Sequence, residues 1–157
     1  MTEGQINLEH ALQLLRTTLY EAIPISRSFG LVIDSYEQGR LILKAPLAPN
    51  INDKGTVFAG TLNAVAILAG WGMLWLTLQE HNMLGTIIIQ DSTIQYFKPV
   101  AGDFSASCRT LGPDQLERLL MMLARKGRAR VELAVEICEA GSAAVAFTGR
   151  YVIDRRM

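Results

Sequence analysis

The stretch GTVFAGTLNAVAILAGWGMLWLTLQ, residues 55–79, contains no charged side chain, although Lys54 precedes it and Glu80 follows it. Its length meets the requirement of about 20 apolar residues for a helix that crosses a membrane. The same composition is also typical of a helix that is buried on every side inside a soluble fold. The choice between these two alternatives decides most of what the sequence can say about function.

Three features favour the buried helix. Asn63 would need a hydrogen-bond partner in lipid. The two flanks show no clear excess of Lys or Arg on one side, which a membrane span usually has. Several amphipathic strand-like runs elsewhere in the chain each need an apolar partner for one face. We therefore predict that residues 61–79 form a dry helix inside a wrapped sheet, and that a membrane is not a partner.

The composition of the chain fits one soluble domain, residues 1–157. Lys and Arg number 15, as do Asp and Glu, so the net charge is zero and nucleic acid is not expected as a partner. Cys108 and Cys138 form no CxxC pair, and both are expected to be small buried hydrophobes in a reducing compartment. The N-terminal stretch lacks the basic and apolar blocks of a signal peptide, so we expect a cytoplasmic protein.

The periodicity predicts a helix, two strands, the long apolar helix, two strands, a short helix and two final strands. The first helix, at about residues 7–23, begins at Asn7 and is stopped by Pro24. Gln38 and Gly39 lie in a polar turn that predicts a hairpin. Mostly short connections between the strands indicate one six-stranded antiparallel sheet in an α+β domain.

Two tracts carry a resemblance to a known family. NINDKGTVFAGTLNAVAILAGWG, residues 50–72, enters the long helix, and YFKPVAGD, residues 96–103, has the form aromatic-x-x-Pro-x-x-Gly-acid. In order and spacing they resemble the hotdog thioesterase superfamily, and look closest to the thioesterase domain that some bacteria carry behind an N-acetyltransferase domain. The resemblance covers about residues 29–154, and the preceding segment is too short to hold an acetyltransferase domain.

The resemblance implies the hotdog fold, a six-stranded antiparallel sheet wrapped around the long helix. An N-terminal helix and one extra helix before the fifth strand complete the expected architecture. The implied activity is hydrolysis of an acyl-CoA or acyl-carrier thioester without metal or other cofactor. The alternative is a catalytically inactive hotdog protein that binds acyl thioesters or acts in regulation.

Relatives of this kind pair two subunits through the edge of the third strand and share the substrate site between them. The resemblance therefore implies a homodimer or a tetramer. The run TIIIQDSTIQYF, residues 86–97, gives an independent reason to expect pairing, because an exposed strand this hydrophobic would otherwise invite aggregation.

The first candidate site is the loop and the start of the long helix, from Asn50 to Thr61. Its leading backbone N–H groups are expected to be free and to stabilise the negative charge that develops on a thioester carbonyl. A glycine in this turn lets the ligand approach the backbone closely. The alternative is that Gly55 and Gly60 only shape the turn into the helix. The expected donors or substrate contacts here are Phe58, Ala59, Gly60 and Thr61.

The catalytic carboxylate is harder to place. Many relatives carry an acid inside the central helix and a His before paired glycines, whereas this chain has no acid from Thr61 to Gln79. The remaining candidates are Asp53, in the loop, and Asp91, in a strand that we expect to be largely buried. Burial would raise the pKa of Asp91 and suit it to act as a base. The alternatives are turn chemistry for Asp53 and an interface or solvent-facing role for Asp91.

Two asparagines and a basic turn complete the candidates. Asn52 and Asn63 could orient water or the carbonyl, or could serve only as structural hydrogen-bonding groups. In the turn RKGRAR, Arg128 and Arg130 could hold the phosphates of coenzyme A, with Lys98 as a further option, although a solvated turn explains them equally. His10 and His81 fit no ligand spacing, so no metal site is expected.

Overall fold

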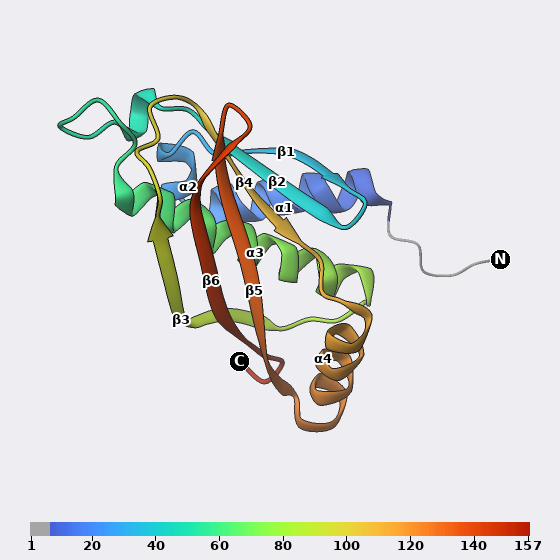
Figure 1. Ribbon diagram of the computed structural model, residues 1–157. Helices are drawn as coiled ribbons and strands as arrows, with labels where there is room; N and C mark the ends of the chain where they lie inside the picture. The colour runs from blue at the N-terminus through green and yellow to red at the C-terminus, as the bar shows by residue number, and fades with distance from the viewer. Residues whose placement is uncertain (1–6) are drawn as a thin grey trace.

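The computed structural model describes residues 7–157 as an α+β fold, in which a curved sheet wraps around one long helix (Figure 1). This is the predicted hotdog architecture, which is confirmed. Residues 1–6 of the predicted domain lie outside the described residues. The helices are α1 (Leu8–Ala22), α2 (Ile25–Ser28), the 3-10 turn η1 (Ala48–Asn50), α3 (Ala59–Glu80) and α4 (Pro113–Lys126). The strands are β1 (Val32–Glu37), β2 (Arg40–Ala45), β3 (Thr86–Tyr96), β4 (Phe104–Arg109), β5 (Arg128–Glu139) and β6 (Ser142–Asp154).

The six strands form one antiparallel sheet in the order β1-β2-β4-β5-β6-β3. The predicted β1–β2 hairpin is confirmed, with Gln38 at φ 50° and Gly39 at φ 68°, the left-handed pair that a tight hairpin turn requires. The connection from β2 through α3 carries the chain across to β3, which therefore lies at the opposite edge of the sheet from β1.

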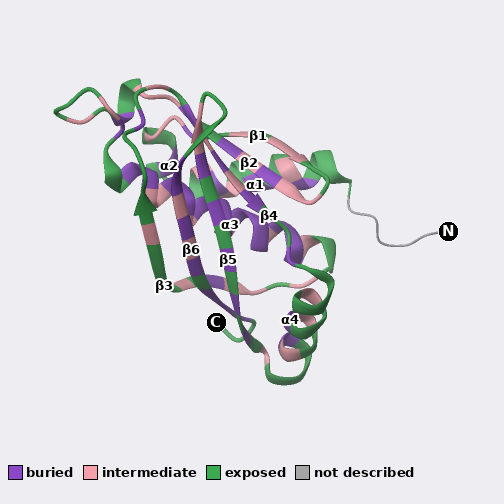
Figure 2. Cartoon of the chain, in the orientation of Figure 1, coloured by how far each residue is buried: buried purple, intermediate pink, exposed green. Residues whose placement is uncertain are grey.

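The long apolar segment is the central helix, as predicted. α3 contacts β2, β3, β4, β5, β6 and α1, and 72% of its most apolar window is buried inside the fold. By length and composition alone it could cross a membrane, but here the sheet covers it. Alternation along β5 supplies part of that cover, since its residues are buried and exposed in turn (Figure 2). The buried side chains of β5 include Val131, Leu133, Val135 and Ile137.

Glycines let the sheet approach the middle of α3 closely. The Tyr151 hydroxyl, on β6, donates a hydrogen bond to the backbone oxygen of Ile67 at 2.9 Å. A Cβ atom at Gly70 would overlap that hydroxyl and lie 2.7 Å from Cζ of the same ring. Burial raises the pKa of Tyr151, so its hydroxyl remains a donor at neutral pH. Glycine has a low intrinsic helix propensity, but at position 70 it allows α3 and β6 to pack together.

The prediction that the third strand is largely buried is wrong. Of the residues in β3, Ile87 is buried, while the stretch from Gln90 to Thr93 is exposed. The physical reason is position: in the described chain, β3 has β6 on one side and no strand on the other, so its outer edge faces solvent. A bulge between Ile89 and Asp91 also interrupts the alternation that a regular strand would have.

We predict that Gly70→Ala lowers the free energy of unfolding by about 1–3 kcal/mol, because the added methyl group displaces the Tyr151 ring or bends the helix. Gly72→Ala is the matched control: both changes gain helix propensity, but a Cβ at Gly72 meets the end of the Leu41 side chain at 3.1 Å and Leu15 at ordinary contact distances of 3.7 and 3.9 Å. Urea unfolding of both variants at one protein concentration measures the difference. Equal stability of the two variants would contradict the packing argument.

Candidate functional site

The loop before α3 is braced by a buried asparagine that sequence analysis did not single out. The Asn50 side-chain amide donates to the backbone oxygens of Phe29, at 2.8 Å, and Pro46, at 2.7 Å. Its own backbone oxygen accepts from the amide of Phe58 at 2.8 Å. Asn50 thereby ties the end of the loop to the start of the sheet and sets where the helix begins.

Asn52 shapes the same loop. Its Oδ1 accepts from the backbone amides of Lys54, at 2.9 Å, and Thr56, at 3.1 Å. Its Nδ2 donates to the Thr56 hydroxyl at 2.9 Å. Both ends of the side chain are therefore engaged in a local turn of the kind that asparagine favours. This geometry supports the structural alternative for Asn52.

The first turn of α3 offers fewer free amides than expected. The Phe58 amide is engaged by Asn50, and the Thr61 amide donates to the Phe58 backbone oxygen at 3.0 Å. The amides of Ala59 and Gly60, in contrast, have no hydrogen-bond partner within residues 7–157, and both residues are exposed. The set of four predicted donors thus reduces to two adjacent N–H groups at the positive end of the helix dipole.

Aromatic side chains surround these two amides. The Phe58 ring lies over Gly60, since a Cβ there would be 2.9 Å from the ring carbon Cζ. The Tyr96 hydroxyl, at the end of β3, donates to the backbone oxygen of Ala59 at 3.3 Å. Phe58 and Tyr96 are both exposed large hydrophobic residues, as is Phe97. Sequence analysis missed Tyr96 as a site residue, although it is the aromatic position of the YFKPVAGD tract.

Asn63 carries an unpaired polar atom one turn into α3. Its Oδ1 is buried and accepts no hydrogen bond from any described residue. A buried acceptor without a donor costs about 1–3 kcal/mol, a cost that a hydrogen bond from a water molecule or a ligand group would offset. Further along the helix, the buried Thr77 hydroxyl donates to the backbone oxygen of Met73 at 2.8 Å. Asn63 is thus the exception in an otherwise dry helix.

Within residues 7–157, neither candidate carboxylate hydrogen-bonds to the first turn of α3. Asp53 is 81% exposed at the loop tip and pairs with Lys54 at 3.2 Å. Asp91 is exposed and pairs with Arg150 at 3.1 Å. Because Arg150 lies between two buried residues of β6 and is opposite Asp91 in the register, both point to the face of the sheet away from α3. The expected burial of Asp91 is therefore wrong.

The basic candidates divide between the two ends of the sheet. Arg128 and Arg130 line a cleft of about 760 Å³ between α4 and β5. Lys98 instead donates to the Ser142 hydroxyl at 2.7 Å, at the far end of β6 from Arg128. The three side chains expected to bind phosphate are thus not brought together within one chain.

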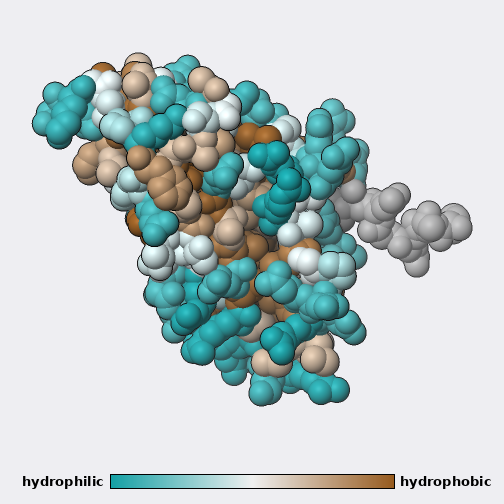
Figure 3. All heavy atoms as spheres, viewed as in Figure 1, coloured by the Kyte–Doolittle hydropathy of each residue, from teal (hydrophilic) through white to brown (hydrophobic). Residues whose placement is uncertain are grey.

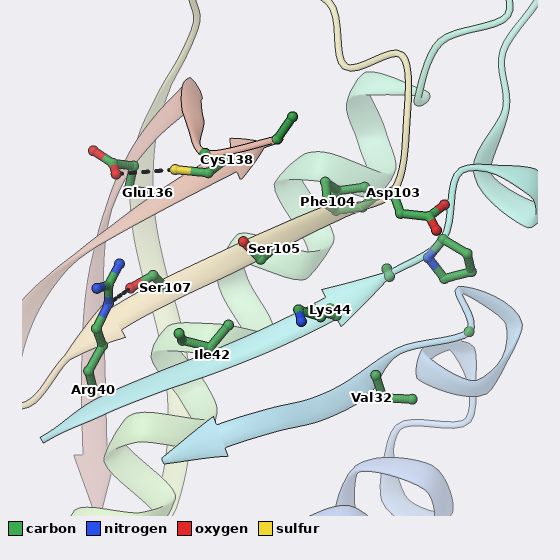
Figure 4. A pocket seen from close by; sticks show the side chains of 15 residues that line it. Val32, Arg40, Ile42, Lys44, Asp103, Phe104, Ser105, Ser107, Glu136 and Cys138 are labelled. Atoms are coloured by element: carbon green, nitrogen blue, oxygen red, sulfur yellow. Dashed lines mark hydrogen bonds between the residues drawn. The ribbon is translucent and has the colours of Figure 1, made fainter. Parts of the chain in front are cut away.

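A second hollow, of about 780 Å³, lies on the outer face of β2, β4 and β5 (Figure 4). Its polar groups largely satisfy one another: Arg40 donates to the Ser107 hydroxyl, and Lys44 pairs with Asp34 at 2.9 Å. The Cys138 thiol donates to Glu136 at 3.3 Å. Among residues 7–157 the lining carries two cations, Arg40 and Lys44, and two acids, Asp103 and Glu136, so the hollow has no net charge with which to hold an ion.

The cysteines partly follow the prediction. Cys108 is buried as expected, and burial raises the pKa of its thiol to about 12, whereas Cys138 is only half-buried. In the part of the chain that the structure describes, no three His, Cys, Asp or Glu side chains gather as a metal site would require.

The chain matches known proteins over most of its length. The family model described as "Putative thioesterase (yiiD_Cterm)" matches residues 12–155. A protein of unknown function from Chlorobaculum tepidum is 35% identical, with a TM-score of 0.89 over 94% of this chain and 96% of that one. A Shewanella oneidensis structure described as a "putative thioesterase" is 34% identical, with a TM-score of 0.81 over 93% of this chain and 98% of its own. A Pseudomonas aeruginosa protein described as a "probable thioesterase" is 22% identical, with a TM-score of 0.76 over 98% and 99%, which shows the fold alone.

We predict that Asn52 acts on the stability of the loop. Asn52→Ala removes every side-chain bond of the turn and is expected to cost about 1 kcal/mol. Asn52→Asp keeps the Oδ1 acceptor but loses the Nδ2 donor, so its stability should fall between that of the wild type and that of Asn52→Ala. Thermal unfolding at fixed protein concentration and amide exchange at Thr56 measure the order. An Asn52→Ala protein that behaves like wild type in both experiments would show that the turn needs no side chain.

Proposed function

The chain belongs to the thioesterase family whose model matches residues 12–155, and we propose that it hydrolyses an acyl-CoA or acyl-carrier thioester at a site shared by two subunits. Water attacks the thioester carbonyl and the carbon–sulfur bond breaks. One proton of the water goes to the departing thiolate and the other is released, so the products are a carboxylate, a thiol and a proton. The reaction needs donors for the carbonyl oxygen, a positioned water and a group that accepts the water's proton.

The amides of Ala59 and Gly60 are the proposed donors to the carbonyl oxygen. They are adjacent, exposed and unpaired, and they lie where the partial positive charge of the helix N-terminus is concentrated. As the oxygen gains negative charge during attack, two such donors stabilise it more than they stabilise the bound thioester, and one donor contributes about 3 kcal/mol. The Phe58 ring, which lies over Gly60, would flank the acyl group.

Asn63 is proposed to hold the attacking water, and its unpaired Oδ1 is the observation that carries the proposal. A water that donates one hydrogen bond to Oδ1 is oriented, and the buried acceptor is then satisfied. An amide cannot take the proton, however, so a carboxylate is still required. Asp53 and Asp91 are the proposed candidates, and the outward placement of Asp91 favours Asp53.

A second subunit is proposed to complete the site. β3 is an edge strand with unpaired backbone groups and the exposed side chains Ile88 and Tyr96. Pairing of two β3 edges would cover this surface and bring another chain beside the helix start. We accordingly propose a cytoplasmic homodimer, or a tetramer built from it, that acts on a soluble thioester, with no metal or other cofactor and with neither membrane nor nucleic acid as a partner.

One observation favours a second function. α3 carries no acid between Thr61 and Gln79, and both candidate carboxylates are engaged in exposed ion pairs. A chain with donors for a carbonyl oxygen but no base would bind acyl thioesters without cleaving them. The second candidate is therefore an inactive hotdog protein that binds thioesters or serves as a regulatory module.

Asn63→Ala is expected to lower kcat/KM for an acyl-CoA about 10- to 100-fold, because the water loses its acceptor. Release of free thiol over a panel of acyl chain lengths measures the effect. Gln79→Ala is the matched control, since it removes an amide from the far end of the same helix and should leave turnover unchanged. Equal turnover by Asn63→Ala and wild type would remove this residue from the mechanism.

Replacing the catalytic carboxylate by its amide should lower kcat about 100-fold or more, the usual contribution of a general base. We expect this result for Asp53→Asn, with a smaller effect for Asp91→Asn and none for Asp114→Asn, an exposed acid at the start of α4. Isothermal titration with a non-hydrolysable thioester analogue runs in parallel. Tight binding by a wild-type protein that releases no thiol would contradict hydrolysis and support the binding module.

A further inference from the structure

The cleft between α4 and β5 is lined by one face of a helix and the start of a strand. Residues 115, 118, 119, 122 and 126 line it from α4, and residues 128–132 line it from β5. Spacings of three and four place these α4 residues on a single side of the helix. Its volume of about 760 Å³ lies within the range of pockets that hold small molecules.

Positive charge in this cleft exceeds negative charge. Among residues 7–157, Glu132 is the one acid that lines the cleft. Buried Asp154 accepts two hydrogen bonds from the Arg156 side chain, at 3.2 and 3.3 Å, and lies 3.9 Å from Arg128. The hydrogen bonds from Arg156 hold the pKa of Asp154 below its usual range, so this carboxylate stays ionised. The cations that line the cleft are Arg118, Lys126, Arg128, Arg130 and Arg156.

Asp154 offsets only part of this charge. Arg118, Lys126 and Arg130 take part in no salt bridge within residues 7–157. The chain as a whole has a net charge of zero, so these cations do not belong to a generally basic surface. The region around α4 and the start of β5 is strongly hydrophilic in Figure 3. Three unpaired cations around one hollow favour an anion with several oxygens, which Arg can bind through two parallel hydrogen bonds.

The floor of the cleft is apolar. Leu119 and Val131 are buried, and Met122 is partly buried beside them. Met122 is the partly accessible apolar side chain of the three, and it is available to an organic ring. A ligand that carries both phosphate and an organic ring therefore matches the cations and the apolar part of the lining, which a bare inorganic ion would not. The hollow shape also favours a small ligand over a flat membrane surface or a nucleic-acid backbone.

We infer that this cleft binds an organic phosphate of the nucleoside diphosphate class. Arg118, Lys126 and Arg130 contact the phosphate oxygens, and the ring rests against Met122. Arg128 and Arg156, held by Asp154, complete the positive wall. Of the phosphate contacts expected from sequence, the cleft retains Arg128 and Arg130 and excludes Lys98.

Two sources share this ligand chemistry: the nucleotide end of a coenzyme A thioester and a free nucleotide. Within one chain the cleft and the start of α3 lie at opposite ends of the sheet. At the cleft, Arg128 pairs with Asp154, which in turn pairs with Thr86 at the start of β3. Tyr96, at the other end of β3, contacts the start of α3. Thr86 and Tyr96 are about 33 Å apart at about 3.3 Å per residue. The nucleotide end of a coenzyme A thioester would therefore have to reach the cleft from the active site of a partner subunit. Of the two sources, only the coenzyme A thioester rests on the proposed function.

Isothermal titration of the full chain with ADP, coenzyme A and inorganic phosphate tests the inference. ADP and coenzyme A are expected to bind more tightly than phosphate, with one site per chain. Arg118→Ala and Arg130→Ala should each weaken ADP about tenfold, and 0.5 M salt should weaken it further. Arg125→Ala is the control: it removes the same charge from the same helix but does not line the cleft, and it should change Kd less than twofold.

Three outcomes would overturn the inference. The first is that neither ADP nor coenzyme A binds. The second is an unchanged Kd for ADP in Arg118→Ala and Arg130→Ala proteins that unfold at the wild-type temperature, and the third is that Arg125→Ala weakens ADP binding as much as they do. The titration needs no turnover, so it decides the inference even if the chain cleaves no thioester. A rise in KM for acyl-CoA in Arg118→Ala, with unchanged kcat and unchanged KM for the acyl-pantetheine, supports the inference with substrate as the source. ADP binding that is sensitive to Arg118 but leaves KM for acyl-CoA unchanged supports it with a free nucleotide as the source.

Discussion

Burial of α3 by the sheet is the constraint on which the rest of the structure depends. A helix without a polar face must be covered on all sides, and a curved antiparallel sheet provides this cover with the apolar faces of its strands. Close approach in the middle depends on Gly70, against which Tyr151 packs while its hydroxyl bonds the backbone of Ile67. Only at its ends do backbone groups of the helix reach solvent, and this places the candidate site at its start.

The same constraint explains the unusual chemistry of that site. A carboxylate inside a helix that is dry on every side would be costly to ionise, and this chain has none between Thr61 and Gln79. The polar functions are moved outward instead: two free amides lie at the first turn, and the acids lie at the loop tip and on the outer face of the edge strand. Inside the helix, the Oδ1 atom of Asn63 is buried and has no hydrogen-bond partner within residues 7–157. Neutral hydrogen-bonding groups thus dominate near the reacting carbonyl of the proposed reaction.

Charge is separated along the long axis of the sheet. The helix start and its aromatic rim lie near the Tyr96 end of β3, whereas the unpaired cations lie near the Thr86 end, between α4 and β5. Asp154 stabilises the second region by anchoring Arg156, so the remaining cations face a hollow with little competition from acids. An antiparallel pairing of two β3 edges would reverse one chain relative to the other and bring the two kinds of region closer together.

Local sequence determined those features that depend on near neighbours. Asn7 caps α1, Gln38 and Gly39 form the hairpin turn, and Gly127 ends α4 in the left-handed conformation, each because of the conformations and hydrogen bonds that these residues favour. The uncharged run from Gly55 to Gln79 likewise determined a central helix, because no other element could bury it.

Only the tertiary structure decided the features that depend on residues far apart in sequence. The exposure of Asp91 follows from strand order and from a bulge, neither of which the strand's own composition reveals. The loss of Phe58 and Thr61 as free donors follows from backbone partners, one of which lies outside the helix in the preceding loop. The basic cleft joins Arg118, Arg130 and Arg156 from a helix, a strand and the C-terminal segment. Patterns along the chain specify which face of an element is apolar, whereas the charges that come to share a hollow depend on how those elements pack.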